Sequence, residues 1–94
     1  MFIYVIGNKT NRQKIGYTSC LKARLSVIQT GNPEPLYIHH SIEVPDEQAK
    51  RIERKIHQEL NYKRVKGEWF NMSPKEATDF VRYAEIRWVD DPLI

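Results

Sequence analysis

Apolar and polar positions follow short periods in the first third of the chain. Aromatic and β-branched residues over 2–7 and again over 13–18 predict two strands. The NKTN segment between them carries turn-forming residues, so the pair predicts a β-hairpin. Apolar residues three and four apart then predict a helix over 20–30, with Ser19 as its N-cap and Gly31 at its end.

A third strand and a long helix are predicted in the middle of the chain. Over 35–44 apolar and polar residues alternate, which places Ile38, His40 and Ile42 on one side of a strand. Over 46–62 apolar residues recur at helical spacing and form a stripe. The strand can extend the hairpin into a sheet, and the striped helix can cover one face of it.

The last part of the chain predicts a short strand and a final helix. The apolar piece EWFNM (68–72) follows a glycine and is typical of an edge strand. Ser73 as N-cap, Pro74 at the first helical position and Glu76 closing a capping box predict the start of the helix. This order of elements predicts an α+β fold: a small, mostly antiparallel central sheet, made of the hairpin and the third strand, with helices packed on it.

Length and composition narrow the class of protein. The 94 residues suit a single domain over 1–94, with a core over about 2–81 and a C-terminal helix and tail to 94. No apolar run approaches the roughly 20 residues that span a bilayer, so we expect a cytoplasmic protein without a membrane partner. A phage or mobile-element origin fits equally well. The single cysteine, Cys20, excludes an internal disulfide and a cysteine-based zinc site.

Positive charge is concentrated in two stretches, although the net charge is only +3. Five cations and no acid precede Glu34, and a second basic stretch runs over 50–66. Such a surface suits a polyanion such as DNA, with RNA as an alternative, but at this net charge the charge by itself favours an ordinary solvated surface. The candidate contacts to nucleic acid are Lys9, Arg12, Lys22, Arg54, Lys63, Arg64 and Lys66.

Glu53 stands beside the apolar stripe of the long predicted helix, one turn before His57. Because an unpaired buried carboxylate is costly, such a residue is paired, hydrogen-bonded, protonated or bound to a metal. The alternative is a boundary glutamate that reaches water or pairs with Arg54 or Lys50, and spacing by itself favours that alternative.

Several polar residues near the hairpin have both a structural and a chemical interpretation. Arg24 borders the apolar face of the first predicted helix, where it can extend its head into water or grip phosphate oxygens through its rigid fork. Tyr4 and Tyr17 suit packing in strands, but a phenol is also a proton donor and acceptor. Lys14 offers these phenols a cationic neighbour.

The histidines do not form a zinc set in this pattern. His39 and His40 are adjacent on a strand and point to opposite faces, so only one of them can join His57. A hard cation held by one carboxylate, waters and substrate phosphate fits better, which is the coordination typical of magnesium.

Taken in order, these residues resemble the GIY-YIG nuclease superfamily, in particular its phage-associated branch with a KIG-type second motif. FIY (2–4) matches the first motif and KIG (14–16) the second. Arg24 lies eight residues past Gly16, and Glu53 matches the metal-binding glutamate of a later helix. The resemblance covers about residues 2 to 81, and the ordered set carries it rather than any one motif.

The resemblance implies a metal-dependent endonuclease that hydrolyses phosphodiester bonds in DNA with low intrinsic sequence specificity. It implies that Glu53 binds Mg²⁺ or Mn²⁺ and that Tyr4 orients or deprotonates the water. It also implies that Arg24, helped by Lys14, stabilises the developing negative charge. A homodimer or a larger protein partner would then supply sequence specificity.

Some positions depart from the family pattern. Phe2 replaces the first glycine, and Lys14 replaces the first tyrosine of the second motif, so either Lys14 or Tyr17 takes over that role. Ile28 stands where many members have a histidine, for which His40 or His57 would compensate.

The late asparagine of the family is matched loosely by Asn71, the last candidate of the site. Because of the departures, two other functions stay open. One is a nucleic-acid-binding module that has lost catalysis. The other is a small accessory or inhibitor domain that binds protein, with Trp69, Phe70 and Trp88 as interface anchors unless they pack in the core.

Overall fold

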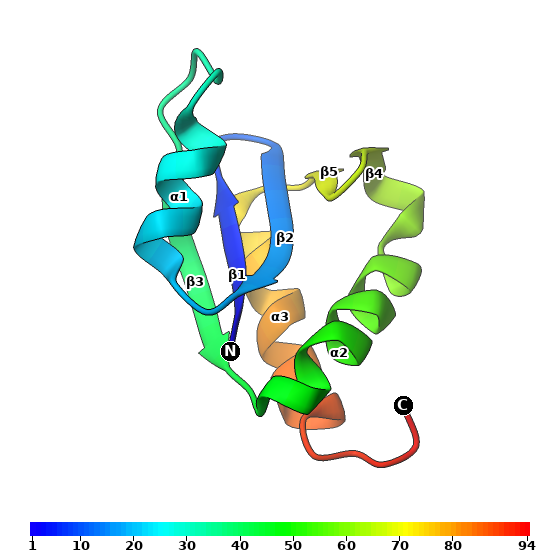
Figure 1. The fold of residues 1–94 in the computed structure, drawn as a ribbon. Coiled ribbons are helices and arrows are strands. Elements are labelled where there is room, and N and C mark those ends of the chain that lie inside the picture. Colours follow the sequence, from blue (N-terminus) through cyan, green and yellow to red (C-terminus); the bar gives the residue numbers. More distant parts are fainter.

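The computed structural model describes all residues, 1–94, as one five-stranded antiparallel sheet with three helices (Figure 1). The strand order is β3-β1-β2-β5-β4. In chain order the elements are β1 (Phe2–Gly7), β2 (Arg12–Thr18), α1 (Leu21–Gln29), β3 (Tyr37–Glu43), α2 (Asp46–Glu59), the 3₁₀ turn η1 (Asn61–Lys63), β4 (Arg64–Lys66), β5 (Trp69–Asn71) and α3 (Pro74–Trp88). The predicted α+β class is confirmed. No helix is both long and apolar enough to cross a membrane.

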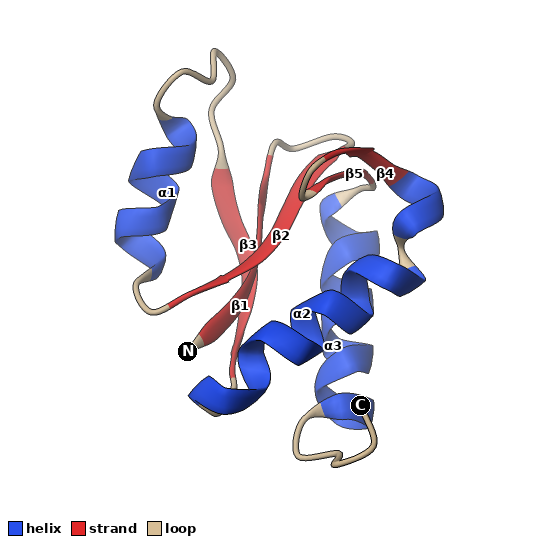
Figure 2. Ribbon diagram, turned by 45° about the vertical axis from the view of Figure 1, so that its right-hand side comes forward, coloured by secondary structure: helices blue, strands red, loops and turns tan.

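The helices cover the two faces of the sheet unequally, with α1 on one side and α2 and α3 on the other (Figure 2). Side chains of β1 alternate between the two faces and contribute to the packing on both. Ile3 and Val5 enter a core of 15 buried residues under α2 and α3. Tyr4 and Ile6 point the other way and form a much smaller cluster with Leu36 under α1.

The last helix begins as the sequence predicts. The Ser73 hydroxyl accepts a hydrogen bond from the backbone N–H of Glu76, and the Glu76 carboxylate accepts one from the Ser73 N–H. These two bonds satisfy N–H groups that have no partner inside the helix. Val81 and Trp88 on this helix are buried, as is Phe70 of β5.

Two helix boundaries and the place of one strand in the sheet differ from the prediction. The N-cap of α1 is Cys20, not Ser19, and the Thr18 hydroxyl accepts the hydrogen bond from the Cys20 N–H. The long helix ends at Glu59 because the chain tightens into η1 there. The short strand β5 is not an edge strand, since it pairs with β2 on one side and β4 on the other. The edge strand β4 is three residues of mixed polarity, too short to show a periodic pattern.

The predicted faces of β3 are also wrong at one point. The pairing of β1 with β3 shifts between Val5 and Ile6, whose partners are His40 and Ile38. Directly paired residues share a face, and Val5 and Ile6 point to opposite faces. Ile38 and His40 therefore lie on opposite faces as well, because the bulge at this shift adds one residue to β3.

Candidate functional site

The candidate site lies where β2 loses its neighbouring strand. Pairing with β5 covers only Arg12 to Lys14, and the backbone N–H of Ile15 bonds to the Glu68 carbonyl just beyond it. Beyond this point no strand pairs with β2 on this side, and side chains of α2 contact its backbone instead. His57 Nε2 donates to the Ile15 carbonyl at 2.7 Å, and Glu53 lies one turn earlier on the same helix, near the Tyr17 N–H.

His57 anchors α2 to this edge as a neutral ring. Burial lowers its pKa, although the hydrogen bond to the Ile15 carbonyl opposes this effect. With the proton on Nε2, the unprotonated Nδ1 faces Glu53 Oε1 at 3.9 Å. The anchor holds the Glu53 carboxylate beside β2.

The Glu53 carboxylate is poised between charged and neutral forms. Its side chain is only 13% exposed. Burial raises the pKa of Glu53 to about 7, and the negative charge of Glu68 adds to the increase. Three groups stabilise the charged carboxylate and so lower this pKa: the Tyr17 N–H, Lys14 and Arg24. A bound cation would stabilise the charged form, so the carboxylate suits a metal ligand.

Gly16 makes room for a phenol above β2. Tyr4 is 1% exposed and pairs directly with Gly16 across the two strands. A Cβ on Gly16 would lie 2.5 Å from the Tyr4 hydroxyl oxygen and 2.9 Å from Glu68 Oε1. Only a glycine allows both oxygens to share this space. Burial, reinforced by Glu68, raises the pKa of Tyr4 well above its usual value, so the phenol is neutral near pH 7.

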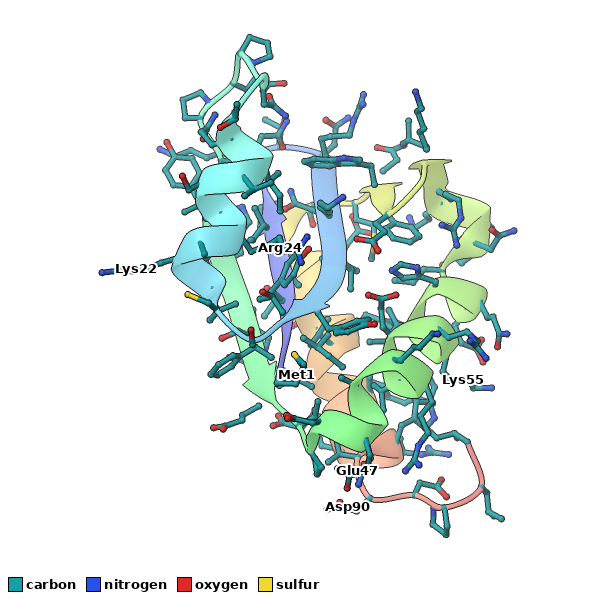
Figure 3. All side chains as sticks on the ribbon, viewed as in Figure 1. Met1, Lys22, Arg24, Glu47, Lys55 and Asp90 are labelled. Carbon is teal, nitrogen blue, oxygen red and sulfur yellow. The ribbon has the colours of Figure 1, made fainter.

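Two cations complete the cluster. Lys14 Nζ lies 3.5 Å from Glu68 Oε1 and 5.5 Å from the centroid of the Trp69 ring. Arg24 projects from α1 across β1 and β2, whereas Lys22 points away from the sheet (Figure 3). No carboxylate lies within ion-pair distance of Arg24, so its guanidinium is available to an anion.

Five of the predicted site residues therefore lie around the edge of β2: Tyr4, Lys14, Arg24, Glu53 and His57. Lys14 shares the face of Tyr4, because it pairs with Ile6.

The remaining candidates lie elsewhere. Tyr17 pairs with Ile3 on the opposite face, where its side chain packs against the large core. Burial lowers the pKa of His40. The charges of Arg82 and Glu85 on α3 also act on this pKa, Arg82 lowering it and Glu85 raising it. Asn71 is exposed and pairs with Arg12 at the other end of β2. The structure does not bring Tyr17, His40 and Asn71 side chains to the Tyr4 cluster.

Glu68 is the site residue that sequence reasoning missed. Its negative charge acts to raise the pKa of three site residues: Tyr4, Glu53 and His57. The available signal was a lone acid between a basic segment, 63–66, and the apolar pair that begins β5.

A polar hollow of about 470 Å³ opens along α2 beside Glu53. It contains no apolar residue and is lined by Lys50, Glu53, Arg54, His57, Gln58, Asn61 and Arg64. Arg64 is held in place by the Asn61 side chain and the Gly67 carbonyl. The hollow can therefore accept an anion next to the carboxylate.

The other predicted nucleic-acid contacts are spread around the molecule. Arg12 and Lys66 line a second hollow with Trp69. Lys9 lies over the Tyr37 ring, and Lys63 pairs with Glu76 at 3.4 Å. Among all 94 residues, no three His, Cys, Asp or Glu side chains gather into a metal-binding set. A single carboxylate with an open polar hollow still fits a cation that keeps its waters and shares substrate phosphate.

The family model of the T5orf172 domain matches residues 1–87, nearly the whole chain. The chain belongs to this family. T5orf172 domains occur in phage and nuclease-like proteins, which is consistent with interaction with nucleic acid. No curated protein and no solved structure matches this T5orf172 domain.

Proposed function

We propose that this T5orf172 domain is a metal-dependent endonuclease of the GIY-YIG type that hydrolyses phosphodiester bonds in DNA. The observation that carries the proposal is the meeting of Tyr4, Arg24 and Glu53, from three different elements, over Gly16 and the edge of β2. Phosphoryl transfer depends on such a combination of positioned charge and water.

Each side chain has a role that its surroundings favour. Glu53 would hold Mg²⁺ or Mn²⁺, which supplies charge neutralisation at the phosphate and at the leaving oxygen. Arg24, free of ion pairs, would bind the non-bridging phosphate oxygens through two parallel hydrogen bonds. Tyr4 is neutral near pH 7, so it would orient the water through its lone pairs rather than act as a preformed phenolate.

The polar hollow along α2 supports a path for the nucleic-acid backbone. Lys50, Arg54 and Arg64 line it next to Glu53 and would contact phosphates that flank the scissile bond. Such contacts carry no sequence information, so low specificity is expected unless a second copy or a protein partner adds it. RNA presents the same phosphates and is an alternative substrate.

Nicking of supercoiled plasmid tests this proposal, in Mg²⁺, in Mn²⁺ and in EDTA. Glu53→Gln removes the charge and keeps the shape of the side chain, so we expect nicking to fall by at least about 1,000-fold, as for loss of a metal ligand. Glu47→Gln is the matched control, because Glu47 is exposed at the far end of the same helix (Figure 3). Equal nicking by Glu53→Gln and the parent would refute the metal assignment.

A nucleic-acid-binding module without catalysis is the second candidate. The pairing of Lys14 with Glu68 favours it, because this cation is already neutralised in part. Folded protein that binds DNA in a salt-sensitive manner but nicks it under none of these conditions would support this function. The protein-interaction alternative is weaker, since Phe70 and Trp88 are buried in the core.

A further inference from the structure

Glu68 lies where a carboxylate oxygen and the Tyr4 hydroxyl oxygen approach the same point above Gly16, and where the carboxylate also pairs with a cation. Glu68 Oε1 and the Tyr4 hydroxyl oxygen share the space that a Cβ on Gly16 would fill. On its other side Glu68 Oε1 lies 3.5 Å from Lys14 Nζ. The carboxylate therefore stands between two groups that the proposed reaction uses.

We infer that Glu68 is a positioning residue of the proposed nuclease site, which orients the Tyr4 hydroxyl and holds the Lys14 ammonium beside it. This inference rests on the proposed function. Glu68 would accept a hydrogen bond from the Tyr4 O–H, as carboxylates orient other catalytic groups. The phenol lone pairs would then be left for the attacking water, and Tyr4 would be held in a single rotamer.

Backbone geometry explains why Glu68 reaches this point. Its carbonyl accepts the hydrogen bond from the Ile15 N–H, which continues the β2–β5 pairing by one residue. This bond fixes Glu68 directly beside Gly16. The neighbouring Trp69 ring lies under the Lys14 ammonium, so the same short segment restrains both ends of the Lys14–Glu68 pair.

Burial and charge are consistent with this arrangement. The Tyr4 side chain is almost wholly buried, so a carboxylate that faces the same space above Gly16 can compete with the few waters that reach its hydroxyl. Glu68 also disfavours ionisation of the phenol, which keeps the proton on Tyr4 available for donation. A neutral donor facing a charged acceptor is the combination that gives a strong hydrogen bond.

The first experiment observes Tyr4 directly and does not depend on cleavage. Protein labelled with carbon-13 at the tyrosine ζ position gives one signal for each of the five tyrosines, and Tyr4→Phe identifies the signal of Tyr4. We expect Glu68→Gln to shift this signal and Glu47→Gln to leave it unchanged. An unshifted Tyr4 signal in folded Glu68→Gln protein would overturn the inference.

The second experiment measures single-turnover nicking together with DNA affinity in EDTA. We expect Glu68→Gln to slow nicking by about 10- to 100-fold, as for other positioning groups, and to leave binding unchanged or slightly tighter. Because Glu68 acts through Tyr4 and Lys14, adding Glu68→Gln to the double variant Tyr4→Phe/Lys14→Gln should slow nicking no further. Multiplied losses in that triple variant would overturn the inference.

The two experiments separate the inference from the function on which it rests. Nicking by the parent protein with no effect of Glu68→Gln would refute the role of Glu68 and leave the nuclease proposal standing. No nicking by the parent would refute the nuclease proposal, while the Tyr4 signal would still decide whether Glu68 orients the phenol.

Discussion

The two faces of the sheet differ in how much apolar surface they bury. Under α2 and α3, 15 buried residues form a continuous apolar core. Under α1, the buried apolar cluster contains only Tyr4, Ile6 and Leu36, and polar groups lie close together at the adjoining edge of β2. One face thus supplies most of the hydrophobic stabilisation, and the other can tolerate buried phenol and carboxylate groups because the first face holds the fold together.

Truncation of one apolar side chain on each face tests this division most strongly. Ile52 is fully buried in the large core, so Ile52→Ala should lower the free energy of unfolding by about 3–4 kcal/mol. Leu25 is only partly buried against the small cluster, so Leu25→Ala should cost about 1 kcal/mol. Urea denaturation measures both, and equal losses would contradict the division of labour between the faces.

A methyl group on Gly16 should damage the site more than the core. Gly16→Ala places a carbon where the Tyr4 and Glu68 oxygens meet, so we expect nicking to fall about 100-fold with a stability loss of about 1–3 kcal/mol. Gly31→Ala is the control, because its Cβ meets no atom and only its positive φ makes it costly. It should destabilise the protein and leave nicking unchanged. Full activity of Gly16→Ala would show that Tyr4 need not lie there.

The pH dependence of stability should reveal the cost of Glu53. Its pKa is about 7 in the folded protein, above the ordinary 4.5, so the folded state keeps a proton that the unfolded chain releases. The stabilising contribution of Glu53 to the free energy of unfolding is therefore complete below pH 4.5, and it is lost as the pH rises through about 7. Glu53→Gln should match the parent at pH 4 and exceed its stability by about 2–3 kcal/mol at pH 8. A constant difference across this range, measured by urea denaturation, would show that Glu53 is not strained by burial.

The smallest expected effect concerns DNA affinity along the polar hollow. Arg54 lines the hollow beside Glu53, so Arg54→Gln should reduce the slope of log affinity against log salt by about 1, the loss of one phosphate contact. Lys22 points away from the sheet and should change this slope less when replaced by glutamine (Figure 3). Fluorescence anisotropy at several salt concentrations measures both, and a larger change at Lys22 would place the DNA on the far side of α1.

The local elements and much of the site can be predicted from the amino-acid sequence. Periodicity and capping residues predict the hairpin, the three helices and the Ser73 capping box, because these features depend on neighbours close in the chain. The ordered motifs also single out Tyr4, Lys14, Arg24, Glu53 and His57, which the structure brings to one edge of β2.

Features that depend on pairing between distant strands emerge only from the three-dimensional fold. The bulge between the partners of Val5 and Ile6 turns Ile38 to the α1 face, away from His40 and Ile42, and no local pattern in β3 predicts it, since register is set by both strands. Glu68 joins the site because β5 begins beside Lys14, and the Glu68 carbonyl, one residue before β5, bonds to the Ile15 N–H. The position of this carboxylate follows from a contact across more than 50 residues of sequence, which residue spacing along the chain does not encode.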